Sequence, residues 1–229
     1  MNDDKLRELQ TMLAYSFRNL SLLTAALTHS SYANENKGSG FDSNERLEFL
    51  GDSVLGMMVA ELIFKTYPDM AEGRMTRLRA ELVCEKSLAG LAGALRLNEY
   101  LLLGRGEEKG GGRNRPSILA DAFEAVIAAI YLDGGYEPAS ELISTLFTLK
   151  AARGDTITSD YKTSLQEMIQ EIPGRTLSYN IVNESGPDHL KSFTVEVSLN
   201  GAAIGSGTGK SKKEAEQTAA KAALEGISK

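Results

Sequence analysis

The chain has 229 residues, 42% of them hydrophobic, with a formal net charge of −6 and a single cysteine, Cys84. This composition excludes a fibrous or disordered chain, and the length allows one large or two small globular domains. No apolar stretch approaches the roughly eighteen residues of a membrane helix, and the first residues lack the features of a secretion signal. One cysteine excludes an internal disulfide. We therefore expect a soluble, cytoplasmic protein in which Cys84 is a small core residue.

Acidic residues exceed basic ones in both parts of the chain. Residues 1–150 hold 16 Lys and Arg against 21 Asp and Glu, and residues 151–229 hold 9 against 10. A nucleic-acid partner would therefore have to be met by local clusters of basic side chains, with metal ions neutralising part of the acidic excess.

Helical periodicity dominates the first two thirds of the chain, and strand-like alternation is absent there. Apolar residues recur at helical spacing over 6–13, 22–27, 47–64, 75–95, 118–132 and 142–149. Breaks between helices are expected at 34–42, 67–69, 104–116 and 134–135, which are rich in residues that favour turns. We expect an all-α domain over residues 1–151.

The pattern changes after a stretch without apolar periodicity, residues 152–159, which predicts a linker. A short helix is expected from Asp160 to Ile172, and residues 177–181 and 193–199 alternate as strands. Asn200-Gly201 indicates a tight hairpin leading to a third strand, and a final helix begins near Ser211. Residues 160–229 therefore predict a small α-β-β-β-α domain, so the whole chain combines an all-α domain with an α/β one.

The first candidate site lies in residues 44–55, Asn-Glu-Arg-Leu-Glu-Phe-Leu-Gly-Asp-Ser-Val-Leu. Glu45, Glu48 and Asp52 share one face of a helix, where each like-charged pair costs about 0.2–0.5 kcal/mol. A divalent cation held by oxygen ligands would compensate. Glu45 alone is also explained as a residue of the first helical turn, where it interacts well with the macrodipole. Glu48 and Asp52 lie beyond that turn.

A second acidic pair interrupts the apolar segment 117–130, whose only charged residues are Asp121 and Glu124. Charges on such a helix are seldom buried unless they are paired or bind metal. Ion pairs with Arg77 or Arg79 are the competing explanation. Together with the first helix, the pair offers oxygen ligands without Cys or nearby His, which favours Mg²⁺ over Zn²⁺.

With these two acidic motifs, the sequence closely resembles the bacterial ribonuclease III family. Residues 44–55 resemble that family's signature stretch, and Asp121-Ala-Phe-Glu124 resembles its second acidic motif. Shorter stretches at 15–17, 26–30 and 72–79 also fit. The resemblance extends from Leu6 to Leu224.

The resemblance implies a homodimeric endoribonuclease that hydrolyses double-stranded RNA, leaving 5′-phosphate and 3′-hydroxyl ends. It implies Mg²⁺ as the cofactor, with Mn²⁺ able to substitute, and a role in processing rRNA precursors and other structured transcripts. The roles implied are metal ligands for Glu48, Asp121 and Glu124, catalytic residues for Asp52 and Glu124, a dimer contact for Phe49, and further acidic cleft positions for Glu45 and Glu72. His29 is expected to form a hydrogen bond at a helix end.

Residues 205–220 resemble the last strand and helix of a double-stranded-RNA-binding domain. Lysines at a helix N-terminus engage phosphates together with free backbone N–H groups, although a lysine run can also be a solvated surface. The RNA contacts implied are Lys210, Lys212 and Lys213 at that helix, Thr163, Gln166 and Glu167 on the first helix, and His189 in the loop 186–189. Such contacts read A-form shape more than sequence.

The alternative function is a non-catalytic double-stranded-RNA-binding or ribosome-assembly protein that retains the fold. Glu48, Asp52, Asp121 and Glu124 are all present, which favours the enzyme.

Overall fold

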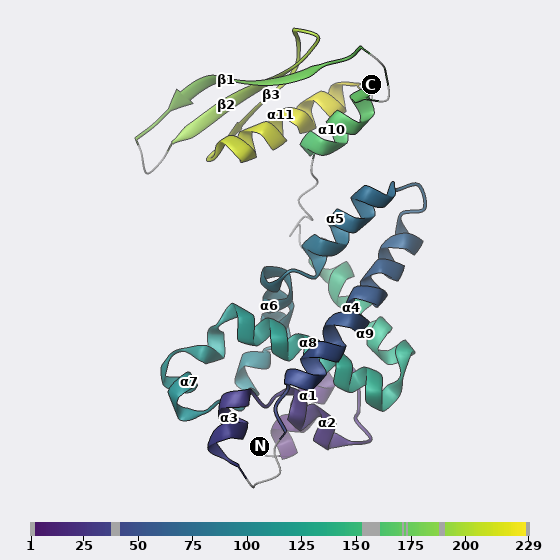
Figure 1. Ribbon diagram of the computed structural model, residues 1–229, viewed down its shortest axis with the longest axis vertical. Helices are drawn as coiled ribbons and strands as arrows, with labels where there is room; N and C mark the ends of the chain where they lie inside the picture. Colours follow the sequence, from purple (N-terminus) through teal and green to yellow (C-terminus); the bar gives the residue numbers. More distant parts are fainter. Residues whose placement is uncertain are drawn as a thin grey trace. The chain divides into compact units, whose positions relative to one another are not determined.

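The computed structural model describes residues 3–37, 42–152, 161–170, 172, 174–187 and 191–227 (Figure 1). The chain divides into two compact units, Met1–Ile157 and Thr158–Lys229. The segment expected as a linker begins at Ala152, which is the last residue of a helix, and residues 153–159 lie outside the described residues. None of the described helices is both long and apolar enough to cross a membrane.

The first unit is helical, which confirms the expected all-α domain. Its helices are α1 (Asp3–Met12), α2 (Leu20–Ala26), α3 (Ser30–Glu35), α4 (Glu45–Thr66), α5 (Glu72–Leu82), α6 (Glu85–Ala94), α7 (Arg105–Lys109), α8 (Pro116–Gly134) and α9 (Tyr136–Ala152), with the 3₁₀ turns η1 (Leu97–Glu99) and η2 (Gly112–Asn114).

The centre of this unit is α8, which packs against α2, α4, α6 and α9 (Figure 1). Nearly every side chain of this helix from Ile118 to Ile130 is buried, as expected for a helix surrounded by others. Only Asp121 and Glu124 interrupt its buried surface, and both are half-buried. The two carboxylates therefore lie at the edge of the hydrophobic core, on an otherwise buried helix.

The structure differs from the expected helices in three places. Residues 75–95 form two helices, because Val83 ends α5 and Cys84 has an extended backbone before α6. A single helix would not allow α5 to pack on α4 while α6 packs on α8. The expected loop 104–116 contains α7 and η2, and α3 was not expected.

The expectation for Cys84 was wrong, because this cysteine is exposed. It stands at the break between α5 and α6, where its Sγ lies 3.3 Å from the backbone oxygen of Glu81. The position is set by the turn between two helices, and a residue there does not face the core.

The second unit has the expected α-β-β-β-α order: α10 (Tyr161–Gln170), β1 (Leu177–Ser185), β2 (Ser192–Leu199), β3 (Ala202–Gly209) and α11 (Lys212–Ile227). The strands form an antiparallel sheet in the order β1-β2-β3. Asn200 and Gly201 both have positive φ, 49° and 85°, as a tight hairpin turn requires. Val195 and Val197 of β2 share a core with Leu165 of α10 and with the alanines of α11.

Alternate glycines of β3 allow α11 to lie directly on the sheet. A β-carbon on Gly205, Gly207 or Gly209 would overlap the backbone of α11 or the side chains of its inner face. The alanines of that face, such as Ala215 and Ala219, are fully buried. Small residues on both surfaces thus fix the position of the last helix and of its N-terminus.

Candidate active site and metal centre

The site begins with the close approach of α4 to α8. Gly51 of α4 faces the backbone carbonyl of Glu124, and a β-carbon at position 51 would overlap that carbonyl. Glu48 lies one turn before Gly51, in the first turn of α4 and not beyond it as expected. The absence of a side chain at position 51 therefore lets Glu48 reach the two carboxylates of α8.

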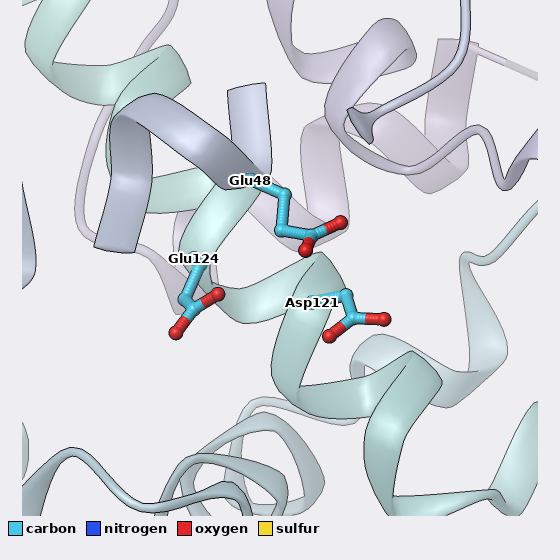
Figure 2. A group of neighbouring side chains, drawn as sticks. All are labelled: Glu48, Asp121 and Glu124. Atoms are coloured by element: carbon cyan, nitrogen blue, oxygen red, sulfur yellow. The ribbon is translucent and has the colours of Figure 1, made fainter. Parts of the chain in front are cut away.

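Three carboxylates from the two helices converge (Figure 2). Glu48 extends from α4, and Asp121 and Glu124 extend from α8. One carboxylate oxygen from each residue lies within 4.8 Å of the others. Two oxygens on opposite sides of a Mg²⁺ ion are about 4.2 Å apart, since each Mg–O distance is about 2.1 Å. Side-chain adjustments of roughly half an ångström would therefore bring the three oxygens into one coordination shell.

The pKa values of all three carboxylates in the cluster are raised. Burial raises the pKa of Glu124 to about 7, with further contributions from Asp52, Asp121 and Glu48. Burial also raises the pKa of Glu48, and Asp121 is the next cause. For Asp121, burial again raises the pKa. Concentrating these charges is unfavourable without a compensating cation.

No arginine neutralises the cluster within the part of the chain that the structure describes. Neither Asp121 nor Glu124 forms an ion pair there, and no arginine contributes to the pKa of either group. The ion pairs with Arg77 or Arg79 that competed as an explanation are therefore not formed in this structure. A half-buried set of oxygen donors with excess negative charge fits a hard divalent cation.

The other acidic residues lie around this group at different distances. Asp52 is close enough to raise the pKa of both Glu48 and Glu124, although it is outside the three-residue group. Glu45 also acts on Glu48, and its Oε2 accepts a hydrogen bond from the Ser43 hydroxyl at 2.9 Å. Glu72 is exposed in the first turn of α5, where its Oε1 accepts from the Thr76 hydroxyl at 2.8 Å.

Two residues near the site were not expected there. His29 lowers the pKa of Asp121, and Glu85, from the first turn of α6, raises it. The expected role of His29 is observed, because its ring caps the N-terminus of α3. Its effect on Asp121 had no local sequence signal, since 92 residues separate the two positions.

The second unit presents the expected basic positions. Lys210, Lys212 and Lys213 are exposed at the start of α11, and the Lys212 ammonium lies 5.8 Å from the centre of the Phe193 ring. Ser211 Oγ accepts from the backbone N–H of Glu214 at 3.1 Å, which caps this helix.

The other positions implied in RNA binding are only partly described. On α10, Thr163 is half-buried and Gln166 is exposed. The side chain of Glu167 and all of His189 lie outside the described part of the structure.

Comparisons with known proteins find a matching family for each of the two units. Residues 19–150 match the family described as Ribonuclease-III-like, and residues 161–227 match the double-stranded RNA binding motif. A Ribonuclease 3 of Pelotomaculum thermopropionicum is 51% identical over 225 residues, which cover 96% of this chain and 92% of the relative. The chain belongs to the ribonuclease III family.

Two other members of the ribonuclease III family are also similar in sequence to this chain. A Ribonuclease 3 of Listeria innocua is 47% identical, with 95% of each chain covered. The solved nuclease domain of ribonuclease III from Campylobacter jejuni is 44% identical, with a TM-score of 0.58, and covers 64% of this chain and 94% of that domain. The expected family and fold class, a helical nuclease domain followed by a small double-stranded-RNA-binding domain, are thus confirmed.

Proposed function

We propose that this ribonuclease III family endoribonuclease hydrolyses double-stranded RNA in a Mg²⁺-dependent reaction, leaving 5′-phosphate and 3′-hydroxyl ends. The observation that carries the proposal is the convergence of Glu48, Asp121 and Glu124 within 4.8 Å, without an arginine partner for the α8 pair among the described residues. Structured transcripts, including rRNA precursors, are the proposed substrates, and the cytoplasm is the proposed compartment.

The acidic residues have three kinds of role in this proposal. Glu48, Asp121 and Glu124 hold the metal ion, and Mn²⁺ can replace Mg²⁺ because both accept oxygen ligands. Bound Mg²⁺ would lower the pKa of a coordinated water and neutralise charge on the phosphate. Asp52, at the edge of the cluster, accepts a hydrogen bond from the attacking water and orients it. Glu45 and Glu72 are proposed as further acidic residues of the same cleft.

The reaction is an in-line hydrolysis. The water oxygen forms a bond to phosphorus, the bond from phosphorus to the 3′-oxygen breaks, and a proton goes to the leaving oxygen. The phosphate therefore stays on the 5′ end of the downstream fragment. The chain's own contribution is to hold four carboxylates in position before the RNA arrives, so that little reorganisation is needed in the transition state.

A homodimer formed through α4 is part of the proposal. Phe49, Met57 and Phe64 of this helix are 80%, 50% and 67% exposed, although all three are large and apolar. Their spacing places them on one side of the helix, which suits a two-fold contact with the same surface of a second copy. Two sites related by such an axis match the approximate two-fold symmetry of an RNA duplex. One solved relative, from Campylobacter jejuni, is described as having a region involved in dimer formation of its nuclease domain.

The second unit supplies duplex binding in this proposal. Lys210, Lys212 and Lys213 contact phosphates at the N-terminus of α11, while Thr163, Gln166 and Glu167 of α10 and His189 reach minor grooves. These contacts carry little sequence information, so the choice of transcript depends on RNA shape.

Cleavage of a long RNA duplex by the full-length protein tests the proposal. We expect 5′-phosphate and 3′-hydroxyl fragments in Mg²⁺ and no cleavage in EDTA. Glu124→Gln should reduce cleavage by at least about 100-fold, because it removes a charged ligand, and should leave duplex binding in a gel-shift assay intact. Glu141→Gln, at an exposed position of α9, is the matched control and should cleave normally.

Two results would contradict the proposal. Cleavage that persists in EDTA would reject the metal requirement. Duplex binding without cleavage by the parent protein, in either Mg²⁺ or Mn²⁺, would instead support the non-catalytic RNA-binding alternative.

A further inference from the structure

Lys210 and Ser211 connect β3 to α11, and Glu214 in the first turn of α11 bonds back to this connection. The Glu214 Oε2 accepts a hydrogen bond from the backbone N–H of Lys210 at 2.7 Å, and the Ser211 Oγ accepts from the backbone N–H of Glu214 at 3.1 Å. This pair of bonds is similar to a capping box, except that Glu214 accepts from the residue before the N-cap. The backbone ahead of the helix is therefore held by a side chain of the helix itself.

The packing of β3 on α11 places the start of the Glu214 side chain. A β-carbon on Gly209, the last residue of β3, would lie 2.7 Å from the Cβ of Glu214 and 2.5 Å from the backbone nitrogen of Ala215. Only glycine allows so close an approach between the strand and the helix. The same contact therefore brings Glu214 next to the connection that its carboxylate holds.

The Glu214 carboxylate bonds to the backbone although three exposed lysines surround it in the sequence. The Lys212 ammonium lies 5.8 Å from the centre of the Phe193 ring. Within the part of the chain that the structure describes, the ammonium groups of Lys210, Lys212 and Lys213 form no ion pair. These three positive charges therefore remain available to phosphates.

The cap also leaves backbone donors at the start of α11. The first N–H groups of a helix have no partner within it. Here the Ser211 Oγ accepts from Glu214, and the carbonyl oxygen of Ser211 accepts from Ala215 at 3.0 Å. The N–H groups of Lys212 and Lys213 have no acceptor among the described residues. Free donors of this kind engage phosphate oxygens.

We propose that Glu214 is a positioning residue for binding of duplex RNA, and that its carboxylate holds the backbone of Lys210 and Ser211 in the conformation that receives a phosphate. A segment already ordered before binding loses less entropy when the partner arrives. This gain exceeds the repulsion between the carboxylate and the RNA. The inference rests on the duplex binding proposed for the second unit, whose residues 161–227 match the double-stranded RNA binding motif, and it does not depend on cleavage.

Two substitutions of Glu214 separate positioning from charge. Glu214→Ala removes both the negative charge and the acceptor for the Lys210 N–H. Glu214→Gln removes the charge and keeps an amide oxygen as acceptor, since Gln serves like Glu at this position of a capping box. If Glu214 acted only by repelling phosphates, both substitutions would strengthen RNA binding by the same factor.

Affinity for a short RNA duplex is measured with the full-length protein in EDTA, by fluorescence anisotropy at one fixed salt concentration. We expect Glu214→Ala to bind about threefold to tenfold more weakly than the parent, because the connection loses its hydrogen bond. Glu214→Gln should bind as tightly as the parent or up to about threefold more tightly, because a repulsive charge is gone.

Glu225→Ala is the control for charge alone. Glu225 is exposed near the C-terminal end of α11, where its Oε1 lies 4.0 Å from the Lys221 ammonium. The substitution removes one negative charge from the same helix, and its affinity should stay within about twofold of the parent.

Hydrogen exchange of the Lys210 backbone N–H, followed by NMR in the full-length protein without RNA, reports the hydrogen bond directly. Exchange should be faster in Glu214→Ala than in the parent, and it should remain close to that of the parent in Glu214→Gln. Circular dichroism checks that each variant is folded at the temperature of the assays. If Glu214→Ala is unfolded there, the affinity and exchange of Glu214→Gln decide the inference.

Three results would overturn the inference. They are tighter RNA binding in Glu214→Ala, weaker binding in Glu214→Gln than in the parent, and unchanged exchange of the Lys210 N–H in Glu214→Ala. A parent protein that does not bind duplex RNA would reject the proposed duplex binding and this inference together. A parent protein that binds but does not cleave in Mg²⁺ would reject the proposed hydrolysis alone, and the same affinities would still decide the role of Glu214.

Discussion

Gly51 of α4 and Glu124 of α8 touch where the two helices cross, with the backbone carbonyl of Glu124 occupying the space that a β-carbon on Gly51 would need. This contact sets the distance between the helices that supply the carboxylates. It therefore couples the packing of the core to the geometry of the candidate active site.

Substitution of Gly51 by alanine should damage both stability and activity. The added methyl group meets rigid backbone, so α4 must move away from α8 at a cost of about 1–3 kcal/mol in the free energy of unfolding. The same movement separates Glu48 from Asp121 and Glu124, and cleavage of duplex RNA should be largely lost. Thermal unfolding and a cleavage assay measure the two effects.

Gly90 provides the matched control, because it is an exposed position of α6 where a β-carbon would meet no atom within 4 Å. Gly90→Ala should raise stability by about 0.5–1 kcal/mol through helix propensity and leave cleavage unchanged. Equal effects of the two substitutions would show that the contact at Gly51 has no special role.

Without bound metal, the stability of the folded protein should fall as the pH rises through the titration range of Glu124. The pKa of Glu124 rises from its ordinary value of 4.5 to about 7 in the folded protein. Between these values the folded chain retains a proton that the unfolded chain has released, so the free energy of unfolding falls as the pH rises. The expected loss is on the order of 1–3 kcal/mol, given partial solvent screening.

Thermal unfolding in EDTA from pH 4.5 to 8 measures this dependence. Glu124→Gln should show a flatter profile, because the group can no longer titrate. Addition of Mg²⁺ to the parent protein near pH 8 should restore stability, since the cation replaces the proton as counter-charge. Identical profiles for the parent and Glu124→Gln would contradict the origin assigned to the raised pKa.

Introducing a charge at Phe49 should dissociate the proposed homodimer. This ring is 80% exposed in one chain, and burying an aspartate at a two-fold contact would leave a charge without a partner. We expect Phe49→Asp to weaken dimerisation by about 2 kcal/mol or more, which is roughly thirtyfold in the dissociation constant. Analytical ultracentrifugation across a range of concentrations measures it.

Leu20→Asp is the control for dimerisation, because Leu20 is an exposed apolar residue of α2, outside α4. The dimer dissociation constant of the Leu20→Asp variant should match that of the parent protein. A dimer of unchanged strength in Phe49→Asp would argue against α4 as the interface.

Removing two lysines of α11 should weaken RNA binding in a salt-dependent manner. Lys212 and Lys213 are exposed at the N-terminus of this helix. Their simultaneous replacement by alanine should lower affinity for duplex RNA and make the plot of log affinity against log salt concentration shallower by about one per lost phosphate contact. Lys221→Ala, further along the same helix, should have little effect. A slope that does not change would place the phosphate contacts elsewhere.

The sequence by itself predicted most of the secondary structure and the residue types of the candidate site. Apolar spacing identified most helices of the first unit, and alternation together with Asn200-Gly201 identified the sheet of the second, because both signals arise within a few neighbouring residues. The identities of Glu48, Asp52, Asp121 and Glu124 likewise predicted oxygen ligands for a hard cation.

Only the tertiary structure decided how these parts meet. The crossing at Gly51, the break that exposes Cys84, and the effect of His29 on the pKa of Asp121 all depend on packing between segments far apart in the chain. Local backbone preferences carry no information about such distances, because they are set by the shapes of side chains that meet only after the helices have packed together.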